Sequence, residues 1–319
     1  MNKPERLAAL HQISDPDVVA GVKNGETRVV KRIESPDDLS KMDQMFADFS
    51  VDFMKRSASE NKPFYLIHSF ARIHNDNFPA PGYKGKSPAG FPVKDAIVEV
   101  DDIVGRLVQT LKDTGQLENT LVFFTSDNGA NEDTWPDSGY QPWRGGKGTT
   151  WEGGVRVPGI AYWPGMIKAG RESDGLFDQM DLFNTSLAVA GEKNRISKKQ
   201  YIDGIDQSGF LLSDDGKSAR QTVFMYSETT LTALRWMEYK VHFKVFQTDA
   251  PRKNIDQSNL MATGSAPWIY NLYTYPKEQV STGHRFFEWG LPQTINFAKA
   301  HAATYQKYPM KSLGLEIPH

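Results

Sequence analysis

Two apolar runs on either side of an amphipathic helix constrain the fold of this 319-residue chain more than any other feature. Residues 64–70 and 121–125 are short and almost continuously apolar, which is typical of strands buried on both faces. Between them, apolar residues recur at helical spacing over residues 94–114, and Gly115 stands where a C-cap glycine is expected. This order predicts an α/β fold with a mostly parallel sheet between helices. Residues at the carboxyl ends of its strands are the first candidates for a functional site.

Further elements are expected on both sides of this strand–helix–strand unit. A serine cap at Ser35, followed by proline and two acids, predicts a helix start. The helix over residues 35–57 has an apolar face made of Leu39, Met42, Phe46, Phe49 and Phe53. Residues 159–163 predict another strand, and residues 181–190 predict a short helix stopped by Gly191.

The composition of the chain changes near Gln221. Four short β-rich runs follow, at residues 222–227, 231–236, 240–246 and 268–273, with turn residues between several of them. A final helix is expected over residues 297–308. We therefore expect a domain over residues 1–220 and a small C-terminal α+β subdomain with an antiparallel sheet over residues 221–319.

Charge and composition exclude several classes of protein. The 37 basic and 39 acidic side chains give a formal net charge of −2, which does not favour a nucleic-acid partner. The sequence has no apolar run long enough for a membrane span, and its start lacks the apolar core of a signal peptide. With no cysteine, disulfides and thiolate chemistry are excluded, so a metal would be held by oxygen or imidazole.

Candidate site residues follow the two apolar runs. Asp127 and Asn128 come directly after residues 121–125, and paired oxygens of this kind suit calcium or magnesium, although Asn-Gly is equally typical of a plain turn. His74 follows residues 64–70 and would reach the same sheet edge, with a solvated loop histidine as the alternative.

Lys147 lies in a glycine-rich segment, Arg144-Gly-Gly-Lys-Gly-Thr, where backbone can approach an anion closely. The segment is not a nucleotide P-loop, because that motif needs glycine where Gln141 stands and serine or threonine where Gly148 stands. Three tryptophans of the same long loop would border a sugar or an aryl group, or pack in the core; they are Trp135, Trp143 and Trp151.

Taken in order, these motifs resemble the C-terminal part of the sulfatases, in the alkaline-phosphatase-like superfamily. The matching segments are Lys62-Pro-Phe-Tyr-Leu; His74; Val100-Asp-Asp through Gly105; Asn119 through Gly129; Arg144 through Thr149; Trp151-Glu-Gly-Gly-Val-Arg-Val-Pro; Trp163-Pro-Gly; and Asp181-Leu. The C-terminal runs 233–243 and 271–278 are similar to the family's closing subdomain.

The resemblance implies metal-dependent hydrolysis of sulfate esters, with Ca²⁺ expected and Mg²⁺ as the alternative. It assigns Asp127 and Asn128 to the metal, and Lys147 and His74 to the sulfate and its leaving group as catalytic and substrate-binding residues. The expected partner is a small sulfate ester or a sulfated glycan. Residues 1–220 would then be the C-terminal part of the catalytic domain.

The family's nucleophile is a formylglycine made from a C/S-x-P-x-R motif, which this sequence does not contain. Ser14-Asp-Pro-Asp-Val has the serine and proline but lacks the arginine. We therefore expect a fragment that is inactive alone and that pairs with the N-terminal half of the same enzyme, which would also carry any periplasmic or secretory signal. Two alternatives are a non-catalytic binder of sulfated ligands and a phosphonate or phosphate ester hydrolase of the same superfamily.

Overall fold

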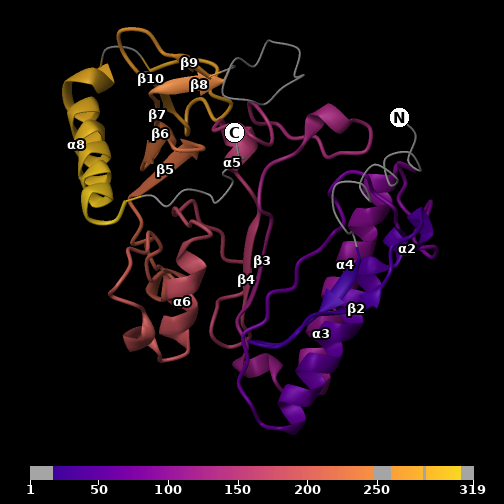
Figure 1. The fold of residues 1–319 in the computed structure, drawn as a ribbon. Coiled ribbons are helices and arrows are strands. Elements are labelled where there is room, and N and C mark those ends of the chain that lie inside the picture. The colour runs from indigo at the N-terminus through magenta and orange to yellow at the C-terminus, as the bar shows by residue number, and fades with distance from the viewer. Residues whose placement is uncertain (1–16, 247–259, 283–284, 310–319) are drawn as a thin grey trace. The chain divides into compact units, whose positions relative to one another are not determined.

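The computed structural model describes residues 17–246, 260–282 and 285–309 (Figure 1). Their contacts divide them into two compact units. The first unit contains the described residues up to Leu121 together with Ala130–Tyr140. The second contains Val122–Gly129 and the described residues from Gln141 onward. The Ser14 segment, weighed above as a nucleophile motif, lies outside the described residues.

Helices dominate the first unit. Its elements are β1 (Val18–Ala20), β2 (Arg28–Lys31), α2 (Pro36–Ser40), α3 (Met42–Ser59), α4 (Pro92–Asp113), and the 3₁₀ turns η1 (Leu117–Asn119) and η2 (Glu132–Thr134). Strands β1 and β2 pair antiparallel. Helices α3 and α4 pack side by side (Figure 1).

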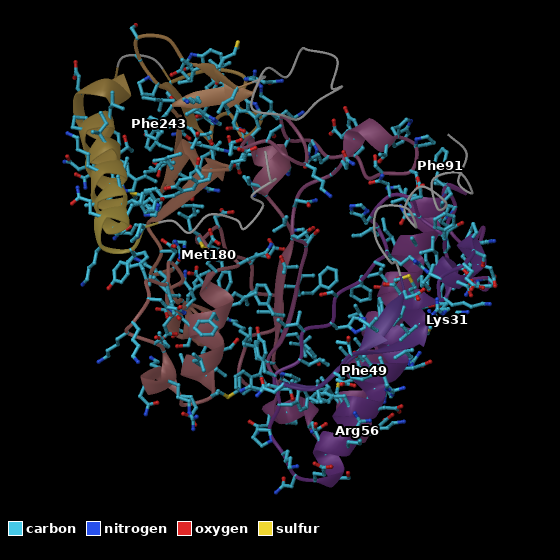
Figure 2. All side chains as sticks on the ribbon, viewed as in Figure 1. Lys31, Phe49, Arg56, Phe91, Met180 and Phe243 are labelled. Carbon is cyan, nitrogen blue, oxygen red and sulfur yellow. The ribbon has the colours of Figure 1, made fainter. Side chains whose placement is uncertain are left out.

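The helix start at Ser35 is confirmed, because the Ser35 hydroxyl accepts a hydrogen bond from the Asp38 amide at 3.2 Å. The predicted single helix is interrupted at Lys41, which separates α2 from α3. The predicted apolar face is wrong at Phe49, which is 61% exposed and is labelled on α3 in Figure 2.

The buried stripe of α3 is displaced by about one residue and contains Asp43, Ala47, Ser50, Val51, Met54 and Ser57. Its polar members are buried because they hold the segment that follows α3. Asp43 accepts from the Ala71 amide at 2.8 Å, and Ser50 hydrogen-bonds the His68 ring at 2.8 Å. A hydrophobic pattern cannot reveal a face whose burial depends on such hydrogen bonds.

Residues 64–70 do not form the predicted buried strand. The segment has no ladder partner among the described residues, and its alternate side chains Tyr65 and Ile67 are 63% and 73% exposed. Its other face lies on α3, where the rings of Phe64 and Phe53 are 5.6 Å apart. The apolar run correctly indicated an extended, packed segment, but a strand also needs a neighbour's backbone groups.

Helix α4 confirms the strongest helical pattern in the sequence. It buries Val100, Ile103 and Leu111 along one face. Beyond its end, Gly115 has φ +70° and donates to the Lys112 carbonyl at 3.1 Å, as expected of a C-cap glycine.

In the part that the structure describes, the second unit combines a four-stranded antiparallel sheet and two strand pairs with several short helices and one long helix. Its elements are β3 (Val122–Thr125), α5 (Glu152–Val155), β4 (Gly159–Tyr162), α6 (Asp181–Val189), η3 (Lys193–Arg195), α7 (Ser208–Leu212), β5 (Thr222–Ser227), β6 (Thr230–Trp236), β7 (Tyr239–His242), β8 (Lys244–Phe246), β9 (Leu260–Ala262), β10 (Trp268–Asn271) and α8 (Arg285–Lys307). The predicted helix stopped by Gly191 is confirmed as α6.

The predicted strands 121–125 and 159–163 are confirmed as β3 and β4, but they do not belong to a parallel sheet. They pair antiparallel, with Val122 opposite Tyr162 and Thr125 opposite Gly159. Every strand pairing among the described residues is antiparallel. A short apolar run indicates burial but carries no information on the direction of its neighbour, so the expected parallel sheet is corrected here.

The C-terminal antiparallel sheet is confirmed, with strand order β10-β7-β6-β5. Helix α8 lies along it (Figure 1) and begins well before the predicted residue 297. Trp289 of α8 packs its ring 5.8 Å from that of Trp236, and Phe243, labelled in Figure 2, packs with Val241 and Ile269. No described helix is long and apolar enough to cross a membrane. The boundary near residue 220 stays a prediction.

Candidate functional site

The Asp127–Asn128 pair lies directly after the carboxyl end of β3, as the sequence predicts. Asp127 is exposed, and its carboxylate has no hydrogen-bond or ion-pair partner among the described residues. Asn128 donates through Nδ2 to the Gly129 carbonyl at 2.8 Å. This bond orients the amide and leaves its oxygen to act as an acceptor or ligand beside the carboxylate.

The loop that carries this pair is held against helix α5. The Gly129 amide donates to the Gly154 carbonyl at 3.0 Å. A Cβ at position 129 would overlap the carbonyl oxygen of Gly153, which is backbone and cannot rotate away. Glycine is therefore required by the close approach of two backbones.

The segment that carries Lys147 packs on the same short helix. The Gly153 amide donates to the Arg144 carbonyl at 2.8 Å, and the Thr149 amide closes the turn onto the Gly146 carbonyl at 3.1 Å. A Cβ on Gly154 would overlap the Thr149 carbonyl oxygen and lie 2.6 Å from that of Gly146. The glycines of this region thus allow two chain segments to pack closely, in addition to leaving the backbone open to an anion.

Helix α5 consequently brings together two of the segments predicted to form a site. Gly154 anchors the Asp127–Asn128 loop, and the neighbouring Gly153 anchors the Lys147 loop. A carboxylate and an amide oxygen on one side and a lysine segment on the other are suited to a divalent cation and an oxyanion.

A pocket of 1310 Å³ opens within the second unit and is lined by both Asp127 and Gly148, the neighbour of Lys147. Trp143 and Arg156 also line it, and the Arg156 guanidinium lies 4.2 Å from the centre of the Trp143 ring. Arg235 is a further lining residue. The pocket therefore presents an apolar face and cationic groups beside the site residues.

The three tryptophans of the long loop have separate environments. Trp151 is 1% exposed and packs against the Tyr270 ring at 5.9 Å, so it is a core residue. Trp135 belongs to the first unit, is 57% exposed and has its ring 5.9 Å from that of Phe91. Of the three, Trp143 is the one that lines the pocket.

His74 belongs to the first unit and lies on an exposed loop. Its Nδ1 is 2.7 Å from the Asn75 carbonyl oxygen, and because that oxygen can only accept, Nδ1 carries a proton. In the neutral ring, Nε2 is then the basic nitrogen.

The loop of His74 is anchored by the buried Arg72. Its guanidinium contacts the carboxylates of Asp43 at 3.1 Å and Glu99 at 3.0 Å. Burial raises the pKa of Asp43, and the Arg72 charge opposes that rise. Buried ion pairs of this kind hold the backbone next to His74 in one arrangement.

The donor set fits a hard cation in part. The Asp127 and Asn128 oxygens are of the kind that calcium takes, but calcium takes about six to eight oxygens. Among the described residues, no group of three or more histidine, aspartate or glutamate side chains is arranged to hold a metal. Two protein ligands therefore fit, and the remaining positions would be filled by other donors.

Sequence reasoning missed a buried polar cluster behind this site, made of Glu152, Lys240, His242 and Glu278. The available signal was the placement of Lys240 and His242 in an apolar strand run, here β7, whose residues from Lys240 to His242 are all buried. Charged residues at such positions need partners, which the sequence does not identify.

A family model described as Sulfatase matches residues 12–192, more than half of the chain. The chain belongs to the sulfatase family. It therefore has the sulfatase, alkaline-phosphatase-like fold, with the antiparallel pairings described above.

Individual sulfatases match over most of this chain but over less of their own length. The crystal structure of the PsFucS1 sulfatase from Pseudoalteromonas sp. is 58% identical and superposes with a TM-score of 0.91 over 97% of this chain and 62% of that one. N-acetylgalactosamine-6-sulfatase of Sus scrofa is 39% identical over 64% of this chain and 38% of its own length. Arylsulfatase A of Bos taurus is 34% identical over 76% of this chain and 49% of its own length. The chain thus spans between about a third and two thirds of these relatives.

Proposed function

We propose that this chain provides the cation- and sulfate-binding part of an enzyme that hydrolyses sulfate esters, giving an alcohol and sulfate with the uptake of water. Asp127 and Asn128 hold a divalent cation, Ca²⁺ by preference, and Lys147 and His74 contact the sulfate and its leaving group. The observation that carries the proposal is the packing of the Asp127 and Lys147 loops on the same helix, α5, in a member of the sulfatase family.

The chemistry of these groups suits sulfuryl transfer. A bound cation stabilises the negative oxygens of the group being transferred. Lys147 places a second positive charge on those oxygens, which is most effective where charge develops in the transition state. His74, with its proton on Nδ1, donates from Nε2 to a leaving oxygen when the ring is doubly protonated.

A sulfated carbohydrate is the substrate class we favour. The pocket combines the flat Trp143 ring with the Arg156 and Arg235 guanidinium groups, which suits an apolar ring face bearing anionic groups. The name of the pig relative, N-acetylgalactosamine-6-sulfatase, supports a sulfated sugar. Aryl sulfates are the second candidate, because the bovine relative is an arylsulfatase.

The attacking group is not among these residues, since the sequence has no cysteine and no S-x-P-x-R segment. We propose that this chain alone binds sulfate without turning over its esters, and that turnover requires a polypeptide carrying that motif. Reading the genomic DNA upstream of Met1 for an in-frame C/S-x-P-x-R motif identifies the polypeptide to assay. If no such motif precedes the chain, a non-catalytic binder of sulfated ligands is favoured.

The lysine tests the proposal directly. In Lys147→Ala, we expect sulfate affinity in the presence of Ca²⁺ to fall at least about tenfold, and turnover by the enzyme that carries the nucleophile to fall about a hundredfold or more. Lys168→Ala is the control, because Lys168 is 63% exposed and its ion pair with Asp214 is 3.9 Å long. Isothermal titration with inorganic sulfate, and in parallel with inorganic phosphate, measures the first effect. Unchanged affinity in Lys147→Ala contradicts the proposal, and preference for phosphate favours a phosphate ester hydrolase.

A further inference from the structure

A buried ion cluster contacts the first residue of α5 in the second unit. Its lysine, Lys240, is 0% exposed and lies between two carboxylates, 2.9 Å from Glu152 Oε1 and 3.3 Å from Glu278 Oε1. His242 Nε2 lies 2.7 Å from the same Glu278 oxygen, and both side chains are 0% exposed. Such a set of charges is stable in the interior only while each has its partner.

Glu278 connects this cluster to the site loops. Its Oε2 accepts from the backbone amide of Glu152, the first residue of α5, at 2.7 Å. Its backbone carbonyl accepts from Arg144 Nη1 at 2.8 Å. Arg144 begins the Lys147 loop, and its guanidinium lies 3.9 Å from the Trp151 ring centre. The same residue therefore holds both the start of α5 and the start of the Lys147 loop.

Lys240 is the one cation among the described residues that contacts both buried carboxylates. Burial lowers the pKa of His242, against the opposing effect of Glu278, so the ring is neutral at pH 7. Its Nδ1 is buried and has no hydrogen-bond partner among the described residues, as suits an unprotonated ring nitrogen. Arg235 and Arg156 form longer ion pairs with Glu152 Oε2, at 3.7 and 3.8 Å, so Glu278 is the carboxylate that depends on Lys240 for its charge balance.

We propose that Lys240 is a positioning residue that fixes α5 and thereby sets the Asp127 and Lys147 loops relative to each other. Without its charge, Glu278 is left among the described residues as a buried carboxylate beside Glu152 with no cation of its own, and the start of α5 separates from Glu278. The Gly129–Gly154 and Gly153–Arg144 backbone bonds, which depend on α5, then open more often. The function of the two loops rests on the proposed sulfatase activity; their mutual placement does not.

Lys240→Met tests the proposal, with Arg220→Met as the matched control. Arg220 is also a buried cation of the second unit, 7% exposed, and it pairs with the fully buried Asp181. Its guanidinium contacts Asp181, Asp203 and Thr222, and none of these residues belongs to α5 or to the two loops. Each substitution therefore removes the cation from a buried carboxylate, but only in Lys240→Met is that carboxylate, Glu278, bonded to the start of α5.

Hydrogen–deuterium exchange on the full chain measures, without a ligand, how firmly the Asp127 and Lys147 loops are held on α5. We expect exchange in peptides covering residues 127–129 and 144–154 to rise about tenfold or more in Lys240→Met, the rate change for an opening made about 1.4 kcal/mol easier. The double variant Lys240→Met/Glu278→Gln, which removes one of the opposed charges, is expected to regain part of the protection. In Arg220→Met the same peptides stay within about twofold of wild type.

A parallel titration separates this inference from the proposed function. With inorganic sulfate and Ca²⁺ as probes, Lys240→Met is expected to bind sulfate about tenfold more weakly than Arg220→Met at a temperature where both are folded by circular dichroism. If wild type binds no sulfate, the proposed function fails, while the exchange result still decides the placement. Equal exchange in the two variants overturns the positioning role of Lys240, and so does wild-type sulfate affinity in Lys240→Met.

Discussion

Replacing Gly129 with alanine tests whether the site loops depend on close backbone packing at α5. The added Cβ would overlap the Gly153 carbonyl oxygen and lie 2.8 Å from its carbon and 3.3 Å from the Gly154 Cα. All three atoms are backbone, so the clash cannot be relieved by rotating a side chain. The loop and α5 must move apart, and the 3.0 Å bond from the Gly129 amide to the Gly154 carbonyl is lost.

The expected cost follows from these two effects. Overpacking of this kind costs about 1–3 kcal/mol, and loss of a backbone hydrogen bond adds about 1 kcal/mol. We therefore expect Gly129→Ala to lower the free energy of unfolding by about 2–4 kcal/mol. In a domain of this size class, each kcal/mol lowers Tm by about 2–4 °C, so the expected decrease is about 4–16 °C.

Thermal and urea unfolding followed by circular dichroism measures this change. Gly209→Ala is the matched control, because Gly209 lies in α7 of the same unit and a Cβ there would meet no atom of another described residue within 4 Å. We expect this variant to melt within about 2 °C of wild type or slightly above it. If Gly129→Ala melts together with Gly209→Ala, the backbone contact at α5 is not the constraint that we describe.

Three further changes test the fold and its electrostatics. Ser35→Ala removes the acceptor of the Asp38 amide and should cost about 1 kcal/mol in urea unfolding; no change would show that this cap is dispensable. Gly105 is exposed on α4, and a Cβ there would have none of the described side chains within 4 Å, so Gly105→Ala should raise stability by about 0.5–1 kcal/mol in the same assay. Burial raises the pKa of Asp181, but Arg220 and the Ile205 and Asp178 amides together outweigh burial and lower this pKa. The stabilisation by Asp181 is therefore full above the unfolded pKa of about 4 and is lost as pH falls through the folded value. Asp181→Asn should therefore be less stable than wild type at pH 7 and lose less stability between pH 7 and pH 2; parallel slopes would refute this assignment.

Local patterns predicted local structure well. The Ser35 cap, the amphipathic α4 with Gly115 at its end, and the helix stopped by Gly191 all occur as expected. Each depends on interactions within a few residues, so each is encoded in a short stretch of sequence. The antiparallel pairing of the C-terminal strands follows similarly from short runs joined by turns.

Long-range pairing was predicted less well. The apolar run at residues 64–70 lies on α3 as an extended segment, and β3 pairs antiparallel with β4. The apolar content of a segment indicates that it is buried. Whether it forms a strand, and whether that strand is parallel or antiparallel, depends on which backbone segment pairs with it. Phe49 shows a similar limit of pattern-based prediction. It is exposed because polar contacts, such as that of Ser50 with His68, determine which face of α3 is buried.

The sequence by itself determined the family, through the order of its motifs, and the candidate residues Asp127, Asn128, Lys147 and His74, because these residue types recur next to recognisable strands and glycines. Only the tertiary structure decided what holds them. Glu152, Lys240 and Glu278 are far apart in the sequence. Their charges form one cluster only when β7 and the segment after β10 pack against α5. Buried charges are tolerated through partners distant in the chain, and distance in sequence conceals those partners until the chain is folded.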